Sequence, residues 1–163
     1  MTYTIDLSPA EDSLTWQYEV RNDGTTRIAV LNGPERAAPD DDPPVWVVNA
    51  GDGTVEVSQR LHDLPDGLAY DEPLYAGGSI LEPGESLTGS ATVALPLALH
   101  HPHVRESDLD SYPGYALPER PQNVMFCLGI LELAPDWDDS WWFAHDGMAR
   151  DQHLLCTDTE PLP

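Results

Sequence analysis

The chain of 163 residues carries 29 Asp and Glu against seven Arg and no Lys, which gives a formal net charge of −22. Nucleic acids and anionic membrane surfaces are bound through clusters of Lys and Arg, so the composition predicts neither as a partner. The length suits a single domain that buries a core without disulfide or metal staples.

The clearest strand pattern lies near the amino terminus. Residues 14–21 alternate apolar and polar side chains without a break. This is the period of a half-buried strand, and it places four side chains inward: Leu14, Trp16, Tyr18 and Val20. Asn22-Asp23-Gly24 is strong turn chemistry, and Arg27–Leu31 reads as the returning strand. The segment therefore predicts a β-hairpin.

Further short strands are predicted along the middle of the chain, between segments rich in turn residues. The predicted strands cover residues 45–48, 54–61, 74–81 and 87–95. Turns are expected at 51–53 and 81–86, and loops at 40–44 and 64–72. Alternation places Val55 and Val57 inward, together with the face formed by Leu87, Gly89, Ala91, Val93 and Leu95.

The carboxyl-terminal part contains two segments without sustained periodicity. Residues 98–121 hold three His and four Pro, and a connection this long in a compact domain is usually functional or disordered. Residues 134–148 form a second loop, rich in aromatic and acidic side chains. Between them, residues 124–133 are the most apolar run and predict a central strand. A closing strand is expected at 153–157 and a frayed tail at 159–163.

The elements together predict an all-β fold, because no segment of ten or more residues shows helical spacing. We expect one antiparallel β-sandwich of about seven to nine strands with long loops, spanning residues 1–158. Two phrases, Tyr-x-Val-x-Asn-Asp-Gly at 18–24 and Leu-x-Pro-Gly-Glu-Ser at 81–86, resemble immunoglobulin-like β-sandwich modules of bacteria, including the intracellular proteinase-inhibitor type. The resemblance covers roughly residues 14–95 and implies an immunoglobulin-like fold with a binding or scaffolding role.

The amino-terminal residues and the cysteines predict a cytoplasmic protein. The chain begins without the basic and apolar regions of a secretion signal. Cys127 and Cys156 are too few for a disulfide framework, and reduced thiols are the default in the cytosol. Both lie in apolar runs, where Cys commonly acts as a small hydrophobic residue, although the two would be close in space if their strands pair.

A histidine run is the sharpest candidate for a metal site. His101 and His103 would project to the same side of an extended segment, with His100 beside them. Asp108, Asp110 or His145 could complete the ligand set. The competing interpretation is a set of exposed loop histidines. The acidic runs Asp40–Asp42 and Asp136–Asp139 lack the pattern of a calcium loop and are expected to be solvated.

The aromatic residues of the second loop are the candidate binding surface for another protein. It comprises Trp137, Trp141, Trp142 and Phe143, with Tyr112 and Tyr115 from the first loop. Alternatively, the four aromatic residues of the second loop could fold over an open end of the core as a lid, because exposed aromatic patches promote aggregation.

The sequence predicts no enzyme and no cofactor, since no nucleophile elbow, phosphate-binding loop or zinc-protease helix is present. We therefore expect a non-catalytic acidic β-sandwich that binds another protein, as an adaptor or inhibitor-like module. One alternative is an acidic decoy or immunity-type inhibitor that occupies a basic site. The other is a metal-dependent enzyme that uses His100, His101 and His103.

Overall fold

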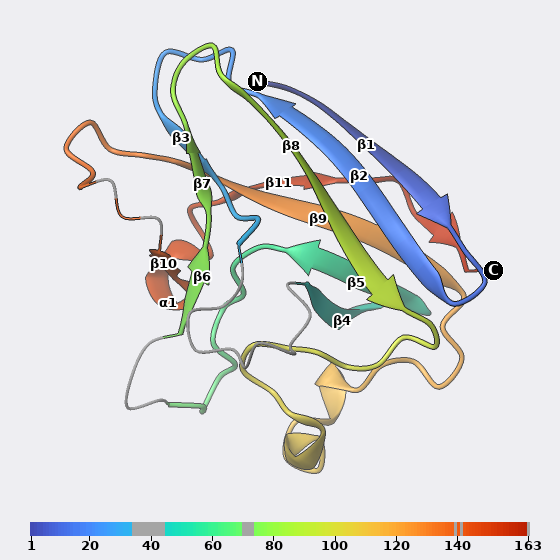
Figure 1. Cartoon of the computed structure of the whole chain (residues 1–163). Coiled ribbons are helices and arrows are strands. Elements are labelled where there is room, and N and C mark those ends of the chain that lie inside the picture. The colour runs from blue at the N-terminus through green and yellow to red at the C-terminus, as the bar shows by residue number, and fades with distance from the viewer. Residues whose placement is uncertain (34–44, 70–73, 139, 141, 163) are drawn as a thin grey trace.

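The computed structural model describes residues 1–33, 45–69, 74–138, 140 and 142–162. Within them the protein is all-β, with short helical turns only, and two main sheets lie one over the other (Figure 1). The predicted loop at 40–44 and the candidate residue Trp141 fall outside the described residues. None of the helices in the described part is long and apolar enough to cross a membrane.

The smaller sheet has three antiparallel strands in the order β1-β2-β8. Their bounds are Thr2–Pro9 for β1, Ser13–Arg21 for β2 and Ser86–Ala94 for β8. The inward face predicted for β2 is confirmed, because Leu14, Trp16, Tyr18 and Val20 are all buried. Strand β1 was not predicted. It forms the outer edge of this sheet, with only Ile5 and Leu7 partly buried against the core.

The larger sheet follows the order β4-β5-β9-β3-β7, with β11 and β12 also paired to β9. The strands comprise Trp46–Gly51 (β4), Thr54–Gln59 (β5), Asn123–Glu132 (β9), Ile28–Val30 (β3), Ser79–Leu81 (β7), His153–Cys156 (β11) and Glu160–Pro161 (β12). Strand β9 is central, as its apolar run predicts. It runs parallel to β5, so the predicted antiparallel arrangement is wrong for this pair, because the chain between the two strands returns to the end of the sheet where β5 begins. The tight turn predicted between β4 and β5 is confirmed, with positive φ at Gly51, Asp52 and Gly53.

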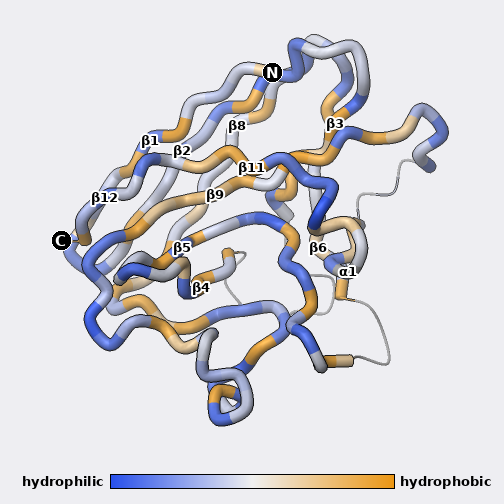
Figure 2. The backbone as a smooth tube through the Cα atoms, turned by 180° about the vertical axis from the view of Figure 1, so that it is seen from behind, coloured by the Kyte–Doolittle hydropathy of each residue, from blue (hydrophilic) through white to orange (hydrophobic). Residues whose placement is uncertain are grey.

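The core explains why β9 is apolar along its whole length. Its even-numbered residues share one cluster with side chains from the smaller sheet, comprising Val124, Phe126, Leu128 and Ile130. On its other face Leu131, with Leu133 just beyond the strand, joins a second cluster around Phe143. A strand covered on both faces reads as a continuous hydrophobic run. Figure 2 shows this run in orange and white through the middle of the molecule.

The predicted hairpin at 14–31 is wrong. Strand β2 already has β1 on one edge and β8 on the other, so β3 cannot pair with it. The chain instead crosses to the larger sheet, where β3 pairs with β7 and β9. Asn22 fixes the crossing, because its side-chain amide donates to the carbonyls of Thr26 and Leu81. The Asn22-Asp23-Gly24 segment therefore connects two strands of different sheets.

Four other sequence predictions need correction. The predicted strand at 74–81 is two strands, β6 (Tyr75–Gly77), which pairs with β10 (Trp142–Ala144), and β7. The predicted frayed tail contains β12, which pairs with β9. Cys127 and Cys156 form a disulfide rather than reduced thiols, because the register of β11 on β9 sets them directly opposite each other. Twelve strands are present in the described part of the chain, more than the predicted seven to nine.

The long connection at 98–121 is confirmed as a segment without strands. It contains two short 3-10 turns, Glu106–Asp108 and Pro113–Tyr115, and a single bridge from His100 to Val47 of β4. Figure 1 shows it below the sheets, in yellow and gold, with both turns projecting away from the strands. The connection is therefore anchored near its start by the bridge, and near its end by a hydrogen bond from the side-chain amide of Asn49 to the carbonyl of Ala116.

Candidate functional site

Five of the six histidines gather where three distant segments meet, and we call them the histidine cluster: His62, His100, His101, His103 and His145. His62 follows β5, and His145 begins the short helix α1 (His145–Met148). The remaining three lie at the start of the 98–121 connection. The histidine run at 100–103 therefore predicted three members of the cluster, whereas no pattern in the sequence indicated His62.

The rings of the cluster pack around one another and around Trp46 of β4. The centroid of Trp46 lies 4.8 Å from that of His100 and 5.7 Å from that of His145. His101 lies 5.3 Å from His62 and 5.8 Å from His103, and His103 lies 5.3 Å from His145. His62, His103 and His145 are at most 5% exposed. These are interior side chains, not the exposed loop histidines of the competing interpretation.

The backbone partners fix which ring nitrogens carry protons. The amide of His62 donates to Nδ1 of His145 at 3.0 Å, and the amide of His103 donates to Nδ1 of His101 at 3.0 Å. Both acceptor nitrogens must be unprotonated, so in the neutral rings the proton is on Nε2. His103 Nε2 instead donates to the carbonyl of His62, and His100 Nδ1 donates to that of Val45. The imidazoles thus tie the three segments together through main-chain groups.

Burial disfavours the charged form at three rings of the cluster, those of His62, His101 and His145. Burial, together with the neighbouring His103 and Arg60, lowers the pKa of His101 to about 3. Burial likewise lowers the pKa of His145 to about 3, with His103 as the next cause. The pKa of His62 is lowered well below its usual range by burial and by Arg60. A low-dielectric setting with positive neighbours disfavours the imidazolium form.

The same hydrogen bonds argue against the predicted metal site. A metal ion needs the free electron pair of an imidazole nitrogen. In His101 and His145 one nitrogen accepts a backbone hydrogen bond and the other carries the proton, so neither ring can be a ligand while these bonds stand. Among the described residues, no three His, Cys, Asp or Glu side chains could hold a metal ion together. Asp108 instead accepts a hydrogen bond from the amide of Arg105.

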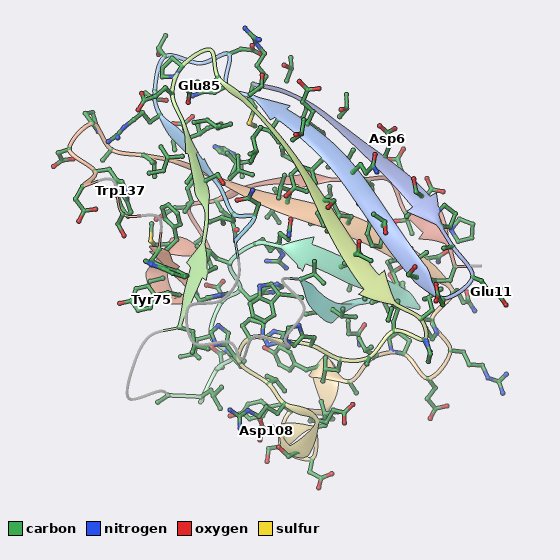
Figure 3. All side chains as sticks on the ribbon, viewed as in Figure 1. Asp6, Glu11, Tyr75, Glu85, Asp108 and Trp137 are labelled. Atoms are coloured by element: carbon green, nitrogen blue, oxygen red, sulfur yellow. A yellow bond between two sulfur atoms is a disulfide. The ribbon has the colours of Figure 1, made fainter. Side chains whose placement is uncertain are left out.

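The described part of the predicted aromatic surface is largely turned inward. Phe143 is fully buried, and Trp137 stacks on it with centroids 5.4 Å apart. The indole of Trp137 also donates to the carbonyl of Ser140. Trp142 is half-buried in β10, and Tyr112 and Tyr115 are half-buried on the first loop. Figure 3 shows Trp137 on an arm beside α1. This packing matches the lid more closely than an open binding face.

A groove lies between the edges of the two sheets, with β1 on one side and β11 and β12 on the other. Figures 1 and 2 show that β1 and the carboxyl-terminal end of the chain lie near each other. The groove consists of two hollows of about 240 and 410 Å³ that share Ile5, Leu7 and Glu160. Its apolar lining includes Leu14, Trp16 and Val124. Cys156 of the disulfide also lines it. The sequence does not predict this groove, because one of its two sides is β1 and no strand is predicted before residue 14.

Charge and backbone give the groove its chemical character. Three carboxylates line it, from Asp6, Asp158 and Glu160, and among the described residues no Arg or His does. Strand β1 pairs with β2 alone, and β11 and β12 pair with β9 alone, within the described strands. The groove therefore combines an apolar lining and acidic walls with sheet edges that have room for a further strand.

In comparisons with known proteins, no family model, no curated protein and no solved structure matches this chain.

Proposed function

We propose that this protein is a non-catalytic, immunoglobulin-like β-sandwich that binds an extended, basic segment of another protein. The observation that carries the proposal is the groove between β1 and the β11–β12 edge, with apolar lining and three carboxylates. The stretch of β1 that lines it, from Tyr3 to Pro9, extends over about 20 Å at the usual rise of a strand. That length accommodates about six or seven residues of an extended peptide.

Strand addition is the binding mode that suits a sheet edge. A peptide that pairs with β1 gains main-chain hydrogen bonds, and every second side chain points toward the groove. Apolar side chains would contact Ile5 and Leu7, which are only partly buried now. Arg or Lys at suitable positions would reach Asp6, Asp158 and Glu160. The partner segment is therefore expected to mix apolar and basic residues.

The acidic coat supports the same partner chemistry. A net charge of −22 attracts a basic segment over a distance and accelerates association, although it gives little specificity by itself. An acidic inhibitor that occupies a basic site, the first alternative from the sequence, would use the same partner chemistry. The metal-dependent enzyme receives no support from the hydrogen bonds of the histidine cluster.

Binding of short synthetic peptides tests the proposal. We expect an eight-residue peptide of alternating Arg and Val to bind more tightly than a peptide of the same composition in two blocks. Replacement of Asp6 by Arg should weaken binding about tenfold. Two charges about 6 Å apart in water interact by about 0.7 kcal/mol, and reversal changes the sign of that energy. Fluorescence anisotropy of labelled peptides measures both differences.

Glu106→Arg is the matched control, because it makes the same charge change at an exposed turn of the 98–121 connection. This variant should bind the peptide with nearly the affinity of the wild type, in contrast to Asp6→Arg. Equal losses in the two variants would show that only overall charge matters and would remove the groove as the binding site. Equal affinity for the alternating and block peptides would contradict strand addition.

A further inference from the structure

We propose that the histidine cluster is an acid-sensitive latch, which holds the start of the 98–121 connection against the sheets at neutral pH and releases it on mild acidification. The latch joins three segments: the chain after β5, the start of the connection and the start of α1. It lies apart from the residues that line the groove and does not depend on the proposed partner.

The closed latch requires neutral imidazoles. Nδ1 of His145 accepts a hydrogen bond from the amide of His62, and Nδ1 of His101 accepts one from the amide of His103. Protonation turns each acceptor nitrogen into a donor, so both amides lose their partners. A buried amide without a partner is costly, and the structure avoids that cost when the segment opens to water. Protonation is therefore incompatible with the hydrogen bonds that these two rings accept in the closed form.

Repulsion between rings acts in the same direction. Imidazolium rings at His62, His101 and His103 would have centroids 5.3 to 5.8 Å apart, and His145 would be equally close to His103. Like charges at this separation repel strongly in a buried setting. The latch is thus expected to open cooperatively, since one protonated ring favours opening and opening favours protonation of the others.

The charged and titratable groups around the cluster do not offset this repulsion. The positive charge of Arg60 lowers the pKa of His62, His101 and His145. Its guanidinium forms an ion pair with Glu56 at 2.6 Å. Asp63, which follows His62, pairs with Arg150 at 3.3 Å. The phenol of Tyr115, whose ring lies 5.0 Å from that of His101, has a pKa raised by burial and by Asp66, so it is neutral.

The expected size of the effect follows from linkage. Three rings, His62, His101 and His145, have lowered pKa values in the closed form and regain an ordinary value near 6.5 when open. At pH 5.5 each such ring increases the equilibrium constant for opening of the latch about elevenfold, so the three rings together increase it about a thousandfold. The sign is fixed by the lowered pKa: opening binds protons, so it increases as pH falls below about 6.5.

Amide hydrogen exchange, resolved by residue with NMR, tests the latch. Both amides donate to imidazoles: the amide of His62 reports the contact between the chain after β5 and α1, and the amide of His103 reports the bond to His101 within the connection. We expect their protection factors to fall by up to about a thousandfold from pH 7.5 to 5.5. At pH 5.5 they should be at least tenfold below those of the β9 amides. Unchanged protection at His62 and His103, or values equal to those of β9 at both pH values, would overturn the proposal.

Three variants separate titration from packing. His101→Asn and His145→Asn each keep an acceptor oxygen near the position of Nδ1 but cannot be protonated. Each should reduce the change in protection between pH 7.5 and 5.5 by about tenfold. His153→Asn, at an exposed position of β11, is the matched control and should leave the change as in the wild type. If the cluster variants do not fold, the pH profile of the unmodified protein still decides the question.

Discussion

Gly89 shows at the scale of single residues how a missing side chain shapes the core. It lies opposite Tyr18 in the pairing of β2 with β8. A Cβ at this position would lie 2.4 Å from the ring of Tyr18, so only glycine leaves room for the ring. The Tyr18 hydroxyl donates at 2.8 Å to Gln59 of β5, which links the two sheets through a buried polar contact.

Replacement of Gly89 by Ala should therefore destabilise the protein by about 1–3 kcal/mol, the usual cost of overpacking. The added methyl group must displace the Tyr18 ring and stretch its hydrogen bond to Gln59. Urea denaturation followed by tryptophan fluorescence measures the change in the free energy of unfolding.

Gly114→Ala is the matched control, because a Cβ at Gly114 meets nothing within 4 Å. Its effect is expected to remain within about 0.5 kcal/mol. A Gly89→Ala variant as stable as this control would show that Tyr18 does not need the space.

Single-residue predictions from the sequence succeeded where a local period decides burial. Alternation along β2 and β8 identified their inward residues, including Trp16 and Val93. The role of Gly89 was not predictable in the same way, because it depends on a partner 71 positions away in a particular register. His62 was missed for the same reason: its neighbours come from other segments.

At the scale of elements, the disulfide fastens β11 to the centre of the larger sheet. Cys127 of β9 and Cys156 of β11 are separated by 29 positions in sequence. A crosslink that closes a loop of this length restricts the unfolded chain and stabilises the native state by about 3–4 kcal/mol. Leu155, beside Cys156, is buried in the main core, so β11 also has its own packing.

A Cys127→Ala/Cys156→Ala double variant should thus fold and lose about 3–4 kcal/mol of stability. Urea denaturation of the oxidised protein and of the double variant gives this difference. The native protein should also fail to react with iodoacetamide under denaturing conditions unless a reductant is added first.

Reduced wild-type protein is the comparison for this experiment, and its stability should lie close to that of the double variant. Alkylation of both thiols in unreduced protein would contradict the disulfide. A double variant as stable as the oxidised protein would contradict its contribution to stability.

The mistaken hairpin illustrates why the pairing of elements is harder to predict than their existence. The strands on both sides of Asn22-Asp23-Gly24 are present, β2 before it and β3 after it. However, one edge of β2 pairs with β1, which directly precedes it in the sequence, and the other edge pairs with the distant strand β8. Turn chemistry specifies a change of direction, whereas the competition for sheet edges is decided by the whole chain.

At the scale of the whole molecule, the acidic residues form an unbalanced coat. Only seven cations accompany 29 carboxylates, and the described ion pairs include Arg60 with Glu56 and Arg21 with Asp23. Figure 3 shows labelled acidic residues at separate places on the surface, including Asp6, Glu85 and Asp108. Self-repulsion of such a coat destabilises the compact state.

Added salt should therefore stabilise this protein. An increase in NaCl from about 20 mM to about 0.5 M shortens the screening length from about 20 Å to about 4 Å and weakens the repulsion. We expect the melting temperature at pH 7.5 to rise by several degrees, which differential scanning calorimetry measures.

Magnesium chloride at equal ionic strength is the control for a specific cation site. Screening alone predicts similar rises for the two salts. A much larger rise with magnesium would identify a divalent site instead, and a fall with NaCl would contradict the account of self-repulsion.

The sequence by itself determined the all-β class, most strand positions, the inward faces of β2 and β8, and the long connection at 98–121. These features depend on local periodicity and turn chemistry, which operate within about ten residues. Only the tertiary structure decided the strand partners, the disulfide, the groove beside β1 and the interior of the histidine cluster. Each of these brings together residues from distant segments, and that proximity arises only when the whole chain buries its core.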